Sequence, residues 1–208
     1  MHATRREDRT VQTDATTWGA NPGTTRGSAR GTARRTWLLW LAGALAFPIA
    51  GLSGTAVAGR VDAAAAALVG GTLSGLVLGA GQALVSRRRL DPRRWIPATA
   101  TGMGAGLLLG ASTVGYGTSL ADLALMGALT GLVLGPAQAL ALPRRTQHRW
   151  SWAAAMPVMW ALGWTATTLG GIHVEEQFTI FGMYGAVTFS AISGALLHRL
   201  LPFEEPRP

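Results

Sequence analysis

Two glutamines, Gln82 and Gln138, are the side chains whose type and position best suit a binding site. Each interrupts a long apolar stretch shortly before an arginine-rich segment, which places it roughly 6–9 Å below the end of a helix that rises 1.5 Å per residue. A buried amide at that depth needs a hydrogen-bond partner. One interpretation is a matched pair lining a polar vestibule. The other is hydrogen bonding between neighbouring helices, which contributes about 0.6 kcal/mol per bond inside a membrane. The sequence leaves both open.

Other residues that could do chemistry are few. The segment 171–178 contains His173, Glu175 and Glu176, whose imidazole and carboxylates could ligate a divalent metal, although a short solvated loop has the same composition. The chain has no cysteine, which excludes disulfides and thiolate sites. The apolar stretches hold no charged residue in their middle, and the P-loop, HExxH and GxSxG motifs are missing from the sequence. We therefore expect no enzymatic activity, no catalytic residue, no cofactor and no metal.

The two glutamines belong to an internal duplication. The segment GTLSGLVLGAGQAL at 71–84 returns as GALTGLVLGPAQAL at 127–140, with ten of fourteen positions identical. Each copy is followed by arginines and then by an arginine-tryptophan pair, Arg94-Trp95 and Arg149-Trp150. This pattern resembles the glycine, glutamine and arginine-tryptophan repeats of uncharacterised multi-pass bacterial membrane proteins. The resemblance implies a membrane location and a helical fold, and it transfers no activity and no functional residue.

The elements that must position these residues are six apolar stretches of roughly 20 residues or more, which is enough for a helix to cross a hydrocarbon core about 30 Å thick. Only 13% of the chain is charged. We predict an all-α fold, a polytopic membrane helix bundle with six transmembrane helices in three helical hairpin repeats. Residues 1–35 are expected to form a disordered basic cytoplasmic tail, 36–200 the membrane domain and 201–208 a short cytoplasmic tail. The hairpins cover 37–86, 95–142 and 150–197, with helices at about 37–58, 63–86, 95–115, 119–142, 150–171 and 178–197.

The arginines predict the orientation of these helices. All 18 basic residues are arginine, and the net charge is +8. Seventeen of them fall in the two terminal segments and in the two connections that follow the repeats, whereas only Arg60 falls in the opposite connections. The positive-inside rule then places both termini in the cytoplasm of a multi-pass protein of the inner or plasma membrane. Because the arginines lie between apolar stretches, we expect anionic lipid headgroups as their partners, and no nucleic acid.

The positions of the glycines, tryptophans and prolines also fit a bundle of membrane helices. Glycine at every fourth position gives a helix a flat face, which suits packing within the bundle, a pore or a homo-oligomer interface, and we expect the first. Tryptophans at the arginine-rich ends are typical of anchors in an aromatic belt. Pro48 and Pro157 each remove a helix hydrogen bond and are expected to kink their helices. The glycines are Gly71, Gly75, Gly79, Gly102, Gly106, Gly110, Gly127, Gly131 and Gly135, and the tryptophans are Trp37, Trp40, Trp95, Trp150 and Trp152.

Two alternatives stay open from the sequence. Ala56-Val57-Ala58 resembles a signal-peptide cleavage site, although the apolar stretch before it exceeds the usual 7–15 residues. For function, the leading hypothesis is a non-enzymatic structural or assembly component of the membrane, whose partners are the lipid bilayer and a second copy or another membrane protein. The alternatives are a small facilitator or channel for an uncharged or weakly polar solute, and a membrane enzyme, for which the bilayer-spanning stretches lack an acid, base or nucleophile.

Overall fold

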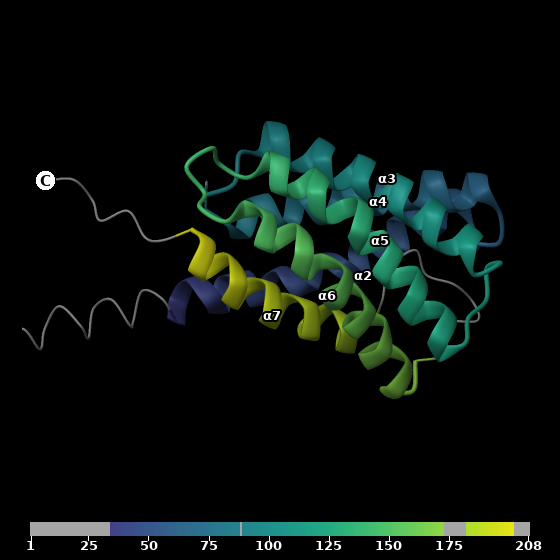
Figure 1. Ribbon diagram of the computed structural model, residues 1–208. Helices are drawn as coiled ribbons and strands as arrows, with labels where there is room; N and C mark the ends of the chain where they lie inside the picture. The colour runs from purple at the N-terminus through teal and green to yellow at the C-terminus, as the bar shows by residue number, and fades with distance from the viewer. Residues whose placement is uncertain (1–33, 88, 173–181, 202–208) are drawn as a thin grey trace, which may run out of the picture.

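The computed structural model describes residues 34–87, 89–172 and 182–201, and all of the long elements in them are helices (Figure 1). The first helical stretch, Arg34–Ala58, contains a short 3-10 turn, η1 (Gly43–Leu45), followed by α2 (Ala46–Ala58). The helices α3 (Ala64–Val85), α4 (Pro92–Thr113), α5 (Leu120–Ala141), α6 (Arg149–Leu169) and α7 (Met183–Leu200) follow. An all-helical fold with six long helical stretches therefore agrees with the sequence-based prediction.

Local chemistry explains where the helices begin. Helix α4 starts at Pro92, three residues before the predicted start at Trp95, because the Asp91 side chain accepts the backbone N–H of Arg93 at 3.0 Å and proline suits the first helical position. Helix α5 starts with a capping box, in which Ser119 Oγ accepts the N–H of Asp122 and the Asp122 carboxylate accepts the N–H of Ser119.

Prolines occur inside several helices without ending them. The 3-10 turn η1 lies just before Pro48, whose missing N–H leaves the preceding turn without one α-helical hydrogen bond. Helices α4, α5 and α6 contain Pro97, Pro136 and Pro157 and continue through them. The sequence predicted kinks at Pro48 and Pro157; the structure has a 3-10 turn just before Pro48, and α6 is continuous through Pro157.

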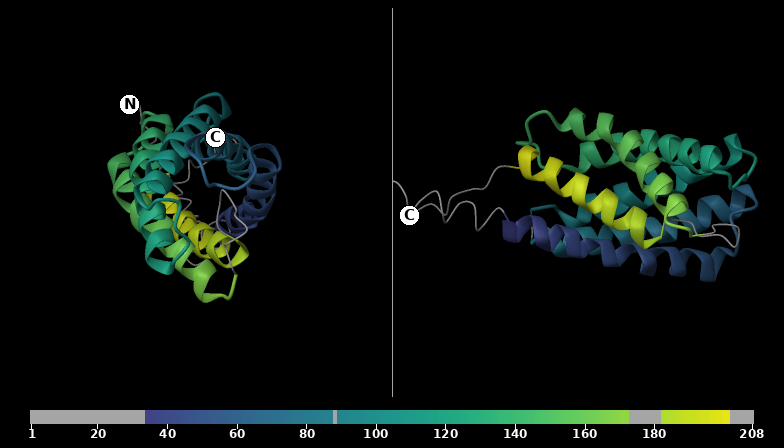
Figure 2. Two further views of the ribbon diagram at one scale, coloured as in Figure 1. Left: turned by 90° about the vertical axis from the view of Figure 1, so that its right-hand side faces the viewer. Right: turned by 90° about the horizontal axis from the view of Figure 1, so that it is seen from below.

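Each helix packs against the one before it and the one after it in the chain. Helix α7 returns to the first helical stretch, where it contacts η1 and the two tryptophans before it, Trp37 and Trp40, so that the six long helical stretches surround a common axis (Figure 2). The start of the first stretch and the end of α7 lie at the same end of the bundle (Figures 1 and 2). The arginine-bearing turns between α3 and α4 and between α5 and α6 lie at that end as well, which we call the arginine end.

Bulky side chains fill the axis of the bundle. The largest fully buried side chains include four tryptophans and two phenylalanines. The Phe47 and Phe189 rings lie 5.4 Å apart between centroids, and the Trp160 and Phe189 rings 5.7 Å apart. Aromatic pairs in this tilted geometry pack favourably beyond their burial. The centre is therefore a packed core; its tryptophans are Trp95, Trp152, Trp160 and Trp164.

Three of the helical stretches are long and apolar enough to cross a membrane, Arg34–Ala58, Ala64–Val85 and Leu120–Ala141. The other three are of similar or slightly shorter length, and together they carry more arginine, threonine and tryptophan than the first three, although α7 has no tryptophan. All six expose large apolar side chains on the outside of the bundle. Among the 22 such residues are Leu45, Leu52, Leu84, Leu109, Leu132, Leu140, Val158, Leu169 and Tyr184.

Candidate functional site

The two glutamines of the repeat lie inside the bundle, where tryptophans of the following helix hold them. Gln82 on α3 is 3% exposed, and its Oε1 accepts a hydrogen bond from Trp95 Nε1 on α4 at 3.0 Å. Gln138 on α5 is 1% exposed, and its Oε1 accepts one from Trp152 Nε1 on α6 at 3.1 Å. Because both amides are buried to this degree, they are packed between helices and do not face a solvent-filled vestibule.

The hydrogen bonds of Gln138 connect three helices. Gln138 Nε2 donates to Thr99 Oγ1 on α4 at 2.9 Å, and that hydroxyl donates to the carbonyl of Trp95 at 2.8 Å. The rings of Trp95 and Trp152 meet edge to face, 6.0 Å apart. The polar side chains of this layer thus form a continuous hydrogen-bonded chain from α6 through α5 to α4, next to the Gln82 pair. Thr99 is a member that sequence reasoning missed, although its position one helical turn after Trp95 puts it on the same face.

The tryptophan that meets each glutamine is the fourth residue of its helix. Trp95 is fourth in α4, which begins at Pro92, and Trp152 is fourth in α6, which begins at Arg149. The arginine-tryptophan pairs had matched Trp95 with Trp150, but Trp150 is the second residue of α6 and is 57% exposed. The helix start sets which way a side chain points, so the spatial counterpart of Trp95 is Trp152.

A similar contact joins α7 to the first helical stretch. Trp40 Nε1 donates to Ser193 Oγ at 3.0 Å, and Trp37 Nε1 donates to the carbonyl of Ala191 at 3.2 Å. A Cβ at Gly194 would lie 2.6 Å from Trp40 Cδ1, so the indole lies directly against the α7 backbone. Three of the packed helix pairs are therefore joined by an indole N–H near the arginine end that donates to an acceptor on the neighbouring helix.

These positions differ from the lipid-facing belt that we expected of the five tryptophans. Trp40, Trp95 and Trp152 are buried, Trp37 is partly buried, and Trp150 alone of the five is exposed. An indole N–H buried at this depth needs an acceptor, and a neighbouring helix supplies one where hydrocarbon does not. Trp150 keeps the outward position of an interface anchor.

The glycine faces pack against neighbouring helices of the same chain. A Cβ added at Gly75 would lie 2.7 Å from Ala100 Cα, one at Gly106 would lie 2.8 Å from the carbonyl oxygen of Thr130, and one at Gly131 would lie 2.5 Å from that of Met156. The α3 face thus meets α4, the α4 face meets α5, and the α5 face meets α6. The glycines that make these contacts are Gly71, Gly75 and Gly79 on α3, Gly102, Gly106 and Gly110 on α4, and Gly127, Gly131 and Gly135 on α5.

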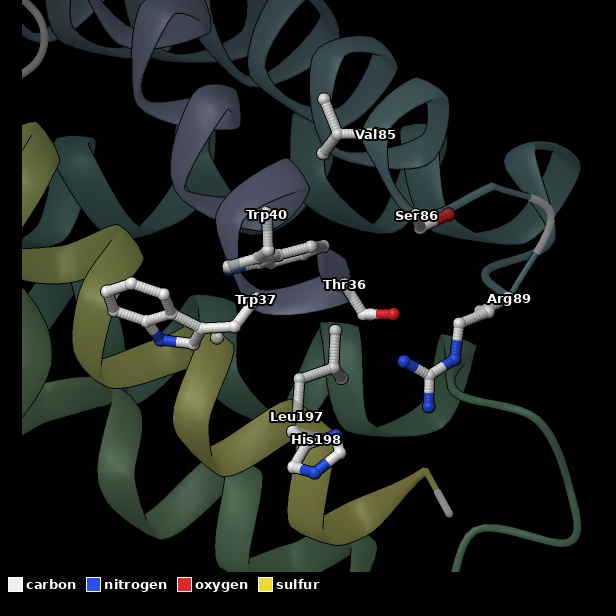
Figure 3. Close-up of a pocket in the computed structure, with 9 residues that line it drawn as sticks. Thr36, Trp37, Trp40, Val85, Ser86, Arg89, Leu197 and His198 are labelled. Atoms are coloured by element: carbon white, nitrogen blue, oxygen red, sulfur yellow. The ribbon is translucent and has the colours of Figure 1, made fainter. Parts of the chain in front are cut away.

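A small polar crevice lies at the arginine end, where the start of the first helical stretch, the end of α3 and the end of α7 meet (Figure 3). Its cavity measures about 10 Å³, which is room for one water-sized atom. The Arg89 guanidinium lines the crevice together with Thr36 and His198 (Figure 3), and it donates a hydrogen bond to the carbonyl of Leu201. Burial lowers the pKa of Arg89 by desolvation. Ser86 is also part of the lining.

A larger groove lies on the outer surface of the bundle between α3 and α4. Its volume is about 490 Å³, and Leu68, Ala105, Leu108 and Leu109 line it together with two hydroxyl residues, Ser112 and Thr113. The Thr113 hydroxyl donates to the carbonyl of Leu109 at 2.7 Å. The groove is shallow and mainly apolar, and it lies apart from the glutamine layer.

The expected metal candidates His173, Glu175 and Glu176 lie outside the described residues. Within the described part of the chain, no group of three or more histidine, cysteine, aspartate or glutamate side chains gathers in one place. The chain matches no protein-family model, no curated protein and no solved structure.

Proposed function

We propose that this chain is an integral membrane protein in which all six helical stretches cross the bilayer, with both termini in the cytoplasm. The apolar outer surface supports this, because 22 large apolar side chains are exposed over all six stretches. An extensive exposed apolar surface is unusual for a soluble monomer and typical of a membrane or protein contact. The described charged side chains occur at the helix ends and in the connections, where the headgroup region would solvate them.

Within that membrane we propose a structural role as a non-enzymatic component, a scaffold that presents a fixed helical surface to lipid and to other membrane proteins. The observation that carries this proposal is the fully packed glutamine layer. Both amides, which would be the polar groups of a solute path, are buried and hydrogen-bonded to tryptophan. A conduit for a polar solute would need these groups to face water along part of the path.

The membrane topology can be tested with introduced cysteines, because the chain has none of its own. Asp62→Cys, Thr118→Cys and Arg145→Cys place one thiol in the first, third and fourth connections, and Arg93→Cys places one at the start of α4, next to the second connection. Six crossings predict that positions 62 and 118 react with an impermeant maleimide from outside, and that 93 and 145 react from the cytoplasmic side. If only the three most apolar stretches crossed, position 118 would react from the cytoplasmic side and position 145 from outside, which would overturn the six-span arrangement.

The scaffold role can be tested by solute flux in proteoliposomes. We expect small neutral solutes such as glycerol and urea to leak no faster than from protein-free vesicles. The Gln82→Ala and Gln138→Ala variants serve as matched probes, because each removes one amide of the layer. Flux above the protein-free control that either variant abolishes would instead establish a facilitator.

A further inference from the structure

Arg89 differs from the other described arginines of the arginine end in its surroundings. Most of these arginines, Arg93 among them, are exposed to solvent, whereas the Arg89 guanidinium reaches back into the crevice between helices (Figure 3). Two other residues of the lining, Thr36 and His198, carry an O–H and a ring N–H, which are groups that can donate a hydrogen bond to an oxygen anion. None of the residues that line the crevice is acidic. The crevice therefore has the donor chemistry of a site for an oxyanion.

The size of the cavity limits what can enter. About 10 Å³ admits a single oxygen atom, so a ligand would place one oxygen inside and keep the rest of its group at the mouth. A phosphate diester at the end of a lipid has that shape, since its non-bridging oxygens project from the headgroup. The two tryptophans of the lining, Trp37 and Trp40, give the crevice an apolar wall beside the Arg89 guanidinium.

We propose that this crevice binds one phosphate oxygen of an anionic phospholipid through Arg89, in competition with the carbonyl of Leu201. The carbonyl of Leu201 is a neutral acceptor, whereas a phosphate oxygen carries the charge opposite to that of the guanidinium, and arginine pairs favourably with phosphate. A phosphate can therefore compete with the carbonyl for Arg89. Binding then moves the Arg89 guanidinium from the carbonyl at the C-terminal end of α7 to the lipid phosphate. The contact between Arg89 and α7 therefore depends on the charge of the headgroup. The proposal rests on the proposed membrane function, because only that orientation brings the crevice to the headgroup level.

The experiment uses the purified full chain in neutral detergent micelles, titrated with phosphatidylglycerol and with phosphatidylcholine, with bound lipid counted by native mass spectrometry. Arg89→Gln is compared with Arg93→Gln, which removes the same charge from an exposed position of the same segment. We expect the tightest phosphatidylglycerol site to weaken about tenfold more in Arg89→Gln than in Arg93→Gln, because it loses a directed ionic hydrogen bond. Equal affinities in the two variants would overturn the site.

Two further arms keep the result interpretable. Thr36→Val removes one donor without touching charge, and it should weaken the same site by about threefold. If Arg89→Gln loses the near-ultraviolet circular dichroism of the wild type, it is misfolded, and Thr36→Val tests the site in its place. An unchanged affinity of Thr36→Val for phosphatidylglycerol would then overturn the proposal. Inorganic phosphate at millimolar concentration should not displace the lipid, and displacement would overturn the lipid as its source. Carbonate extraction of membranes tests the proposed function separately. If it released the wild-type protein, the chain would not be an integral membrane protein.

Discussion

Replacing Gln138 with leucine tests the most connected side chain of the glutamine layer. Leucine has a similar volume, so the change removes hydrogen bonds without leaving the cavity that alanine would leave. Two bonds are lost, the 3.1 Å bond from Trp152 Nε1 and the 2.9 Å bond to Thr99 Oγ1. The Thr99 hydroxyl keeps its bond to the carbonyl of Trp95, but the Trp152 N–H is left buried without its partner.

The magnitude follows from these two losses. Hydrogen bonds between membrane helices contribute about 0.6 kcal/mol on average and up to about 1.7, and a buried donor without an acceptor costs about 1–3 kcal/mol. We expect Gln138→Leu to lower the free energy of unfolding by about 2 kcal/mol. Gln82→Leu breaks the single bond from Trp95 that is seen at its Oε1, and it should cost about 1 kcal/mol.

The assay is reversible unfolding in mixed micelles on titration with sodium dodecyl sulfate, followed by near-ultraviolet circular dichroism of the buried tryptophans. A double-mutant cycle of Gln138→Leu with Trp152→Phe cancels the loss of ring volume and isolates the hydrogen bond. The expected coupling energy is about 1 kcal/mol. A cycle with Trp150→Phe serves as the control, since that ring is exposed and its change should add independently. A coupling within about 0.3 kcal/mol of zero for the Gln138–Trp152 cycle would refute the hydrogen-bonded layer.

Three further predictions use the same unfolding measurement. Gly131→Ala should lower the free energy of unfolding by about 2 kcal/mol, because the added methyl would lie 2.5 Å from a backbone oxygen. Gly43→Ala should change it by less than about 0.5 kcal/mol, because its methyl would meet a valine side chain at 3.1 Å. Equal effects of the two changes would contradict the packing of the glycine faces. Trp152→Phe should cost about 1–3 kcal/mol and Trp150→Phe less than about 0.5, and the reverse order would show that the sequence-based pairing of tryptophans was correct. Ser119→Ala removes the α5 capping box and should cost about 1 kcal/mol, so an unchanged midpoint would mean that this helix end is frayed.

The sequence predicted the helices more closely than it predicted their contacts. Apolar stretches and clusters of arginine located all six helical stretches, and most helix ends fall within a few residues of the expected positions. At α4 the start is shifted by three residues, because Asp91 and Pro92 form a cap that begins the helix early. Helix length is a local property of composition, which is why a single sequence can supply it.

The pairing of Gln138 with Trp152 could not be predicted in the same way. Sequence alignment matched Trp95 with Trp150, because both follow an arginine. The direction in which an indole points depends on its position after the helix start, at about 100° per residue, so a two-residue difference turns the side chain to nearly the opposite face. The crevice at Arg89 was also missed, because its lining comes from three segments that lie far apart in the chain.

The sequence by itself determined that the chain forms apolar helices with glycine faces. It also determined that a glutamine recurs in the duplicated segment and that the arginines fall in alternate connections. These are properties of each segment, and they need no neighbour to be expressed. Only the tertiary structure decided what each polar group contacts. It brings Trp40 of the first helical stretch against Ser193 of α7 and buries both glutamines against tryptophan. The physical reason is that a hydrogen bond has two partners, and the position of the second depends on how the helices pack.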